Sequence, residues 1–321
     1  MKIRISFRKT LLLFILGMCF TAGVSCGTKP STDTSIAQGE FTAQINGLKL
    51  WYKVSGKGPV CILPTPGWGP SGELYFLKLT PLEEMFTMVY LDTRGCGRSE
   101  RPDLHAYSMR DLVSDLEGLR EHLGVDSMWL LGHSDGGPMI LNYACAHRVR
   151  VKGLILVDAP AGTPGEGAER MRRLQMRKGE PWFEKTWKEF QTPPTTQIEF
   201  ESYIRSILPF FFSSQVNLEK NLDVFEKTTL SFEAQCGRGL SDQSTADLAS
   251  NLPTMKIPTL ILAGDEDFIC PPSSAEALHD LIPNSSLVEI KQAGHFPWLE
   301  KPEEFFQSIE TFVQAGVKAK N

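Results

Sequence analysis

The clearest chemical signal in the chain is a serine set among glycines, in Gly132-His133-Ser134-Asp135-Gly136. This segment follows the apolar run 128–131 and precedes the apolar stretch 139–144, so we predict a sharp strand-to-helix turn with Ser134 at its tip. Glycines two positions to either side let the strand and the helix pass close to each other. Such a turn presents a hydroxyl nucleophile and directs backbone N–H groups at the reacting atom. We expect His133 to point away from that atom and to pack.

Asp267 and His295 supply the acid and the base that a serine nucleophile needs. Asp267 follows the apolar run 259–263, and His295 follows the run 286–290. A histidine beside the serine takes its proton and later returns it to the leaving group. A carboxylate orients that histidine and stabilises its protonated form. The three residues come in the order serine, aspartate, histidine, which is one of the known orders for this chemistry.

Other carboxylates near strand ends are weaker candidates for the acid. Asp265 and Glu266 belong to the turn after 259–263, and we expect them to serve that turn or to face solvent. Asp158 ends the apolar run 153–157 and is the reserve candidate. We expect it instead to anchor a buried loop.

The rest of the sequence alternates short apolar runs with amphipathic stretches. Asn46-Gly47 between two alternating segments predicts a β-hairpin. Residues 108–123 carry apolar side chains at helical spacing after the N-cap Ser108, and 302–312 repeat that spacing. Together these elements predict an α/β fold with a mostly parallel eight-stranded sheet and helices on both faces. The expected strands are 41–46, 48–54, 60–63, 87–91, 128–131, 153–157, 259–263 and 286–290.

Residues 161–251, which we call the cap segment, interrupt this alternation. They contain no expected strand, many aromatic residues and the breaker Pro193-Pro194. A stretch of this length between two strands is too long for a loop. We predict an inserted helical cap above the strand ends, where ligands bind in open α/β sheets; a purely stabilising helical layer is the alternative. The core of the fold then comprises 41–160 and 252–321, and the aromatic cap favours an apolar substrate group.

Composition and charge exclude several classes of protein. The 321 residues are 41% hydrophobic and 22% charged, which is typical of a globular protein and not of a disordered chain, a collagen, a coiled coil or a polytopic membrane protein. The net charge is −5. Because there is no basic surplus to neutralise a phosphate backbone, we expect no nucleic-acid partner.

The first 26 residues predict export. Four basic residues precede the apolar stretch 10–20, and small residues follow as far as Cys26. This is the layout of a signal peptide over residues 1–25, and the apolar stretch is short for a membrane span. The ending Val-Ser-Cys resembles a bacterial lipoprotein signal, which implies Cys26 as a lipid anchor; a plain signal peptide with a coincidental cysteine is the alternative. Residues 26–40 are polar and predict a flexible tether.

The cysteines predict free thiols. Five follow Cys26, an odd number with irregular spacing and no CxxC pair. We therefore expect no structural zinc site. Several lie in apolar runs and should be buried, although one disulfide remains open in an oxidising compartment. Without residues 1–25 the chain has 29 basic and 38 acidic residues, a net charge of −9.

From residue 41 to the C-terminal helix the chain resembles the α/β-hydrolase superfamily. The resemblance rests on the motifs around Ser134, Asp267 and His295. It rests also on residues 91–99, Leu-Asp-Thr-Arg-Gly-Cys-Gly-Arg-Ser, which match the D-x-R-G-x-G-x-S segment of the family. In the family this segment shapes a loop beside the active site. The resemblance therefore implies structural roles for its residues Asp92 and Arg94.

The loop after the third expected strand resembles an oxyanion loop of this family. It reads Pro64-Thr-Pro-Gly-Trp-Gly, where the family variant reads His-Pro-Pro-Gly-Trp-Gly. The oxyanion hole needs one N–H from this loop and one from the residue after the nucleophile, Asp135. Proline has no N–H to donate. The loop donor is then Gly67 or Trp68, and we favour Trp68.

Within the superfamily the resemblance divides between two branches. The Pro-Gly-Trp-Gly loop, the Gly-Cys-Gly-Arg-Ser segment and the helical cap are similar to proline iminopeptidases, which hold a substrate amino group with cap glutamates. Glu189 and Glu233 occupy plausible positions, but we expect them to be surface residues. Iminopeptidases typically place tryptophan where this chain has Asp135. Esterases, lactonases and carbon–carbon bond hydrolases often have an elbow like His-Ser-Asp-Gly-Gly, and dehalogenases and epoxide hydrolases need an aspartate in place of Ser134.

The resemblance and the residues together predict a serine hydrolase that cleaves a carboxylic ester or related acyl bond through an acyl-enzyme. Ser134, His295 and Asp267 would form the triad, with the N–H groups of Trp68 and Asp135 as the oxyanion hole. An aminopeptidase that releases N-terminal residues, and a catalytically silent homologue that only binds a ligand, are the alternatives. We expect a small molecule or short peptide as substrate, no metal and no organic cofactor. We also expect membrane contact only through the lipid anchor, on an exported protein of the bacterial cell envelope.

Overall fold

The computed structural model describes residues 36–241, 243 and 248–318. The predicted signal peptide, Cys26 and most of the predicted tether therefore lie outside the described residues. Among the helices that are described, none is long and apolar enough to cross a membrane.

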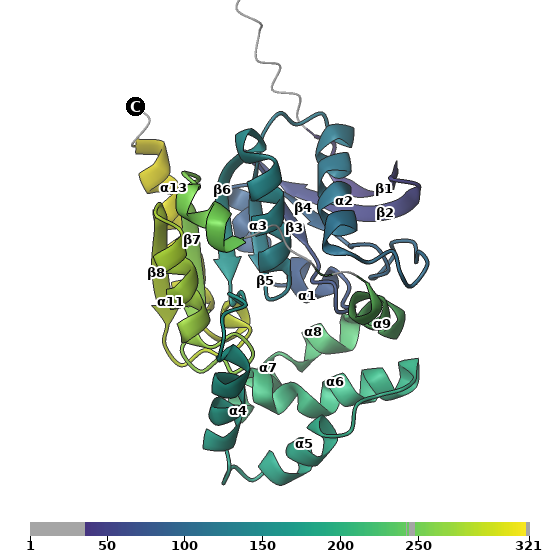
Figure 1. Ribbon diagram of the computed structural model, residues 1–321, viewed down its shortest axis with the longest axis vertical. Coiled ribbons are helices and arrows are strands. Elements are labelled where there is room, and N and C mark those ends of the chain that lie inside the picture. Colours follow the sequence, from purple (N-terminus) through teal and green to yellow (C-terminus); the bar gives the residue numbers. More distant parts are fainter. Residues whose placement is uncertain (1–35, 242, 244–247, 319–321) are drawn as a thin grey trace, which may run out of the picture. The chain divides into compact units, whose positions relative to one another are not determined.

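An eight-stranded sheet runs through the middle of the fold (Figure 1), in the order β1-β2-β4-β3-β5-β6-β7-β8. Its β1–β2 and β2–β4 pairs are antiparallel and the remaining pairs are parallel. The predicted mostly parallel sheet is confirmed. The strands are β1 (Gly39–Ile45), β2 (Leu48–Gly56), β3 (Val60–Pro64), β4 (Thr87–Leu91), β5 (Met128–His133), β6 (Val151–Val157), β7 (Thr259–Gly264) and β8 (Ser285–Ile290).

The predicted hairpin joins β1 and β2 through Asn46 and Gly47. Both residues have positive φ, 51° and 82°, as a two-residue turn of type I′ requires. The pairing extends back to Gly39, which lies opposite Val54. The first strand thus begins two residues before the predicted start at residue 41, because backbone pairing with β2 continues beyond the apolar alternation.

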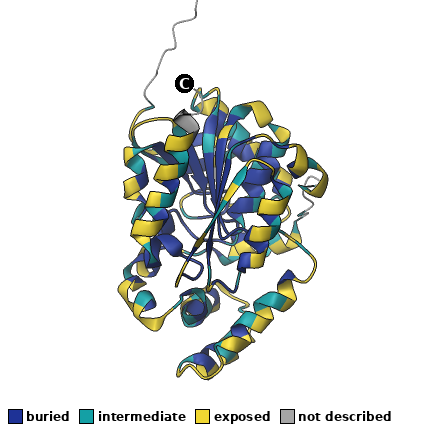
Figure 2. Cartoon of the chain, turned by 90° about the vertical axis from the view of Figure 1, so that its left-hand side faces the viewer, coloured by how far each residue is buried: buried dark blue, intermediate teal, exposed yellow. Residues whose placement is uncertain are grey.

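Helices cover both faces of the sheet, and alternate residues of the strands serve the two sides. In β5, Leu130 packs on one face and Leu131 on the other. Figure 2 shows the central strands as the most buried part of the fold, with helices outside them, whereas the edge strands β1 and β8 are partly exposed. One face is covered by α2 (Met109–His122), α3 (Gly136–Ala146) and α11 (Pro272–Leu281), and the other by α1 (Glu73–Phe76), the turn Thr80–Glu84, α12 (Pro297–Glu300) and α13 (Pro302–Lys318).

The cap segment is helical between β6 and β7. The helices up to residue 240 gather at one end of the sheet (Figure 1), and part of α6 and α8 packs into the same apolar cluster as α1 and α13. The short helix α10 instead contacts α3 on one face of the sheet. No strand of the sheet falls in the described part of this segment. The helices are α4 (Glu166–Met176), α5 (Phe183–Phe190), α6 (Gln197–Phe211), α7 (Gln215–Lys220), α8 (Leu222–Lys227), α9 (Phe232–Leu240) and α10 (Leu248–Asn251).

The five cysteines of the described region are all free thiols, so none of them uses the disulfide left open by the sequence. Cys61, Cys96 and Cys270 are buried. Burial raises the pKa of Cys96 to about 11 and also raises the pKa of Cys61 and of Cys270, which favours the neutral thiol in all three.

Candidate active site

Ser134 lies in the turn between β5 and α3, as predicted. Its φ of +52° is a left-handed value that a residue with a side chain adopts only when its surroundings enforce it. Two backbone bonds do so in this turn: Ser134 N–H donates to Val157 O at 3.0 Å, and Gly137 N–H donates to Ser134 O at 2.8 Å. The side chain is nearly enclosed, with 6% of the residue exposed.

Two glycines, Gly132 and Gly137, permit this turn. Of the two glycines predicted to do so, Gly132 and Gly136, only Gly132 is among them. A Cβ on Gly132 would lie 2.6 Å from Gly136 O, so strand and helix can cross there only without a side chain. Gly136 itself has room for a Cβ, whose nearest neighbour would be Pro64 O at 3.7 Å. The second close approach is instead at Gly137, where a Cβ would overlap Ala159. The expected role of Gly136 was therefore wrong by one position.

Asp267 and His295 meet where the loops after β7 and β8 converge. His295 Nδ1 lies 2.7 Å from Asp267 Oδ2, and the two residues are only 2% and 1% exposed. The N–H groups of Ile269 and Cys270 donate to the same carboxylate at 2.8 and 3.2 Å. Because Nδ1 is the donor to Asp267, the other ring nitrogen, Nε2, remains to accept a proton. Within the described region, no hydrogen bond joins Ser134 Oγ to His295, a looseness common in sites without substrate.

Asp158, the reserve acid, anchors the neighbouring loop. Its φ is +44°, and its Oδ1 accepts the Gly264 N–H at 2.8 Å, which ties the end of β6 to the end of β7. Its Oδ2 has no partner among the described residues. Burial, followed by repulsion from Asp267, raises the pKa of Asp158 well above its usual range. Its surroundings therefore favour the protonated form of the Asp158 carboxyl.

His133 packs behind the site, as expected from its place beside the nucleophile. Its Nε2 donates to His295 O at 2.9 Å and its Nδ1 accepts from Tyr75 Oη at 3.0 Å. Burial, together with the nearby His295, lowers the pKa of His133 well below its usual range. It is a neutral residue that supports the backbone of His295.

The N–H groups of Gly67, Trp68 and Asp135 bear on the predicted oxyanion hole. In the described part of the chain none of the three makes a hydrogen bond. The loop that carries Gly67 and Trp68 is held from behind, because Thr65 N–H donates to Leu91 O at 2.9 Å. Both predicted loop donors therefore remain candidates.

Two groups of metal-ligating side chains come together around His295. One comprises His133, Asp158 and His295, and the other comprises Asp267, Cys270 and His295. Several of their ligand atoms already have hydrogen-bond partners: Asp267 holds His295 Nδ1, and the two nitrogens of His133 bond to Tyr75 Oη and to the backbone oxygen of His295. The arrangement suits proton transfer better than ion binding.

Sequence reasoning missed Glu300, which joins the His295 loop to the cap segment. Its Oε1 accepts the Gly294 N–H at 2.7 Å, and its Oε2 accepts from the N–H and hydroxyl of Ser213 at 2.8 and 2.6 Å. His295 N–H also donates to Phe211 O at 2.8 Å. The end of α6 is thus bonded directly to the loop of the base. A glutamate at the end of a short helix carries no sequence signal for such a role.

Sequence reasoning also missed an ion pair between the cap segment and the turn at Ser134, residues 132–136, which we call the elbow. Arg238, on α9, donates from Nη2 to Asp135 Oδ2 at 2.8 Å and to Oδ1 at 3.0 Å. The guanidinium is mostly buried, with its side chain 11% exposed against 33% for Asp135. The two residues lie 103 positions apart, and each resembles an ordinary surface charge when seen alone.

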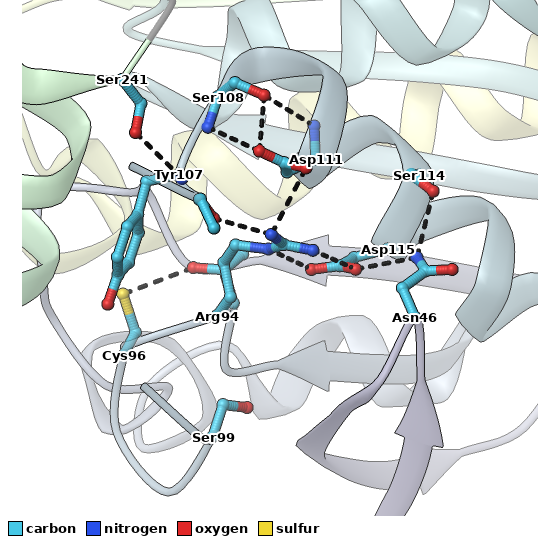
Figure 3. Close-up of polar contacts among 12 residues, drawn as sticks. Asn46, Arg94, Cys96, Ser99, Tyr107, Ser108, Asp111, Ser114, Asp115 and Ser241 are labelled. Atoms are coloured by element: carbon cyan, nitrogen blue, oxygen red, sulfur yellow. Dashed lines mark hydrogen bonds and ion pairs between the residues drawn. The ribbon is translucent and has the colours of Figure 1, made fainter. Parts of the chain in front are cut away.

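Asp92 and Arg94 hold the loop beside the site, in agreement with the roles implied by the resemblance. Asp92 accepts the N–H groups of Gly72 and Arg98 at 2.7 and 2.8 Å. Arg94 forms two bonds of 2.7 Å with the buried Asp115 and donates to Ala106 O (Figure 3). Neither touches Ser134, Asp267 or His295 through a hydrogen bond of the described residues.

Aromatic side chains of the cap segment extend to the acid and the base. Phe211 lies 5.7 Å from the His295 ring and 5.5 Å from the Phe268 ring, measured between centroids. Phe210 and Phe190 also contact Phe268, the residue after Asp267. The predicted cap glutamates are not part of this surface, because Glu189 is exposed and the exposed Glu233 pairs with Arg101 at 3.6 Å.

Comparison with known proteins places this geometry among hydrolases. A family model described as alpha/beta hydrolase fold matches residues 62–302. A proline iminopeptidase of Thermoplasma volcanium is 26% identical over 298 residues, which cover 85% of this chain and 96% of the relative. A probable proline iminopeptidase of Leptolyngbya boryana is 28% identical over 285 residues, which cover 77% of this chain and 84% of the relative. The structure of a thermophilic esterase from Thermogutta terrifontis superposes with a TM-score of 0.66 at 25% identity. The superposition covers 87% of this chain and 99% of the esterase.

Proposed function

The chain belongs to the α/β-hydrolase fold family and is a hydrolase; on that premise we propose that it cleaves a carboxylic ester or a related acyl bond by way of an acyl-enzyme. Ser134 Oγ attacks the carbonyl carbon while His295 Nε2 takes the hydroxyl proton. His295 then gives that proton to the leaving oxygen, and water, activated by the same nitrogen, releases the acid. The 2.7 Å contact between His295 and Asp267 is the observation that carries this proposal.

The proposed oxyanion hole consists of the N–H groups of Trp68 and Asp135. They would donate to the carbonyl oxygen as it gains charge, a stabilisation that is worth about 3–4 kcal/mol for one donor in comparable enzymes. The loop and elbow positions of the two residues support this role, as does the lack of other partners for their N–H groups in the described region. Gly67 is the alternative loop donor.

We propose short acyl chains as the preferred substrates. Ser134 is nearly enclosed, with 6% of the residue exposed, and the ring of Phe211 in the cap segment lies 5.7 Å from the His295 ring. A long acyl chain would have to displace side chains around the nucleophile, whereas an acetyl or butyryl group needs less room.

An aminopeptidase acting on N-terminal proline is the second candidate, favoured by the two iminopeptidase relatives. Such an enzyme needs a carboxylate at the site to bind the substrate ammonium group. Glu189 and Glu233 are exposed, and Asp135, which follows the nucleophile in the chain, is paired with Arg238. These contacts favour the hydrolysis of an ester over the release of an N-terminal proline.

Parallel assays separate the two candidates. We expect purified protein to hydrolyse p-nitrophenyl esters with kcat/KM falling as the acyl chain lengthens beyond about four carbons, and to leave proline p-nitroanilide intact. Cleavage of the anilide that requires a free amino group would identify an aminopeptidase instead. Absence of turnover together with absence of fluorophosphonate labelling would support the silent homologue and contradict both enzyme proposals.

We also propose that the chain is exported and carries a lipid on Cys26. The support is the basic, apolar and small-residue order of residues 1–26. Cells fed a radiolabelled fatty acid should label the protein, and Cys26→Ser should abolish the label. Cys19→Ser, which changes a cysteine inside the apolar stretch, is the matched control and should keep it. A label that survives Cys26→Ser would contradict the proposal.

A further inference from the structure

We infer that Arg238 is a positioning residue for the oxyanion side of the site, where it neutralises the Asp135 carboxylate and holds the elbow in place. The inference rests on the proposed function. It concerns a residue of the cap segment that lies outside the proposed triad and outside the proposed oxyanion hole. Its basis is a set of contacts that one side chain makes with both halves of that hole.

The first contact is with the elbow. Both oxygens of Asp135 accept from Arg238 Nη2, at 2.8 and 3.0 Å. Asp135 follows the nucleophile directly, so its side chain and its proposed oxyanion-binding N–H belong to the same residue. A side chain fixed by two bonds to a mostly buried guanidinium restricts the rotation of that residue.

The second contact is with the oxyanion loop. A Cβ on Gly67 would lie 2.7 Å from both Cδ and Nε of Arg238. The arginine stem therefore lies directly against the loop backbone at Gly67, beside Trp68. One side chain thus packs on the loop and pairs with the elbow, and it spans the two backbone segments that supply the proposed oxyanion donors.

The guanidinium has two further hydrogen-bond partners. Its Nη1 donates to Tyr107 O at 3.3 Å and to the side chain of Gln243. Tyr107 N–H donates to Ser241 Oγ at 3.0 Å (Figure 3). The carbonyl oxygen of the preceding residue, Ala106, accepts from the buried Arg94. Arg238 is therefore fixed from the core side as well as from α9.

Charge explains why this pairing matters for an acyl transfer. In the transition state a negative charge develops on the substrate oxygen, beside the residue that carries the Asp135 carboxylate. An unpaired carboxylate would repel that charge. With Arg238 in place the pair has no net charge, so the oxyanion meets the N–H dipoles without that repulsion.

The test replaces Arg238 with methionine, which removes the guanidinium charge and keeps an unbranched apolar side chain. Arg238→Met in the full chain should lower kcat for a p-nitrophenyl ester about tenfold to a hundredfold, with a smaller change in KM. Labelling of Ser134 by an uncharged fluorophosphonate should slow by a similar factor. Adding Asp135→Asn to Arg238→Met should restore most of the rate, because the repelling charge is then gone.

Two further variants control the test. Arg101→Met removes the exposed pair between Arg101 and Glu233 of the same helix α9, and it should leave kcat within about twofold of the parent value. Arg238→Lys keeps the charge and should retain more activity than Arg238→Met. It also provides a second test of the charge if the methionine variant folds poorly.

Three results would overturn the inference: an unchanged kcat in Arg238→Met, no recovery in the double variant, or a lysine variant as slow as the methionine variant. A parent chain that neither turns over esters nor reacts with fluorophosphonate would overturn the proposed function, and this inference with it. The labelling of the parent chain therefore tells the two failures apart.

Discussion

Ser134→Ala should lower kcat for ester hydrolysis by about 10⁴- to 10⁶-fold, because it removes the only atom proposed to form a bond with the substrate. The residual rate would come from the oxyanion donors and from substrate binding. KM should change much less than kcat, since a missing hydroxyl takes little from ground-state binding. Steady-state kinetics and fluorophosphonate labelling measure the two effects.

Ser274→Ala is the matched control for this variant. Ser274 is also buried, and its hydroxyl has no partner among the described residues. Its removal should leave kcat unchanged and should not lower the melting temperature. Retention of more than about a hundredth of the parent activity in Ser134→Ala would mean that another group is the nucleophile.

Asp267→Asn should lower kcat by about 10⁴-fold, because the amide cannot stabilise the imidazolium form of His295 and can select the wrong tautomer. The loss should be greatest in kcat, since among the described residues the Asp267 carboxylate hydrogen-bonds to the base and to the backbone of its own loop. Asp158→Asn is the counterpart: it changes the reserve acid in the same buried region and should keep at least about a tenth of the activity. Equal losses in the two variants would make the assignment of the acid wrong.

The Asp158 variant should also change how stability depends on pH. The folded pKa of Asp158 is raised above its unfolded value, so the folded chain holds a proton that the unfolded chain releases. The stability from this group is complete below the unfolded pKa, near about 4, and is lost as pH rises toward the folded pKa. Asparagine tolerates positive φ and does not titrate. The melting temperature of Asp158→Asn should therefore fall less between about pH 5 and pH 8 than that of the parent, and a steeper fall would contradict a raised pKa for Asp158.

The parts of the molecule that follow from local patterns were predictable from the sequence. The eight strands, the Asn46-Gly47 hairpin and the elbow at Ser134 each depend on residues that are neighbours in the chain. Apolar periodicity, turn residues and a glycine-flanked serine encode such features directly.

The parts that depend on distant partners were not predictable. Arg238 becomes informative only when α9 lies against the elbow, and Glu300 only when the end of α6 lies against the His295 loop. In a sequence each is one charged residue among many. The Gly136 error has the same origin, because the room at a glycine depends on Pro64 and Ala159, which are distant in the chain. A single sequence records no such proximity.

The free thiols have a consequence for how the protein reaches its fold. Since none of the five cysteines between residues 36 and 318 is cross-linked, every contact of the core forms from an unbridged chain. Folding then needs neither an oxidant nor an isomerase to sort the pairings. The same structure is accessible in a reducing and in an oxidising environment, and Cys61, Cys96 and Cys270 are shielded in the finished core from the oxidants of the latter.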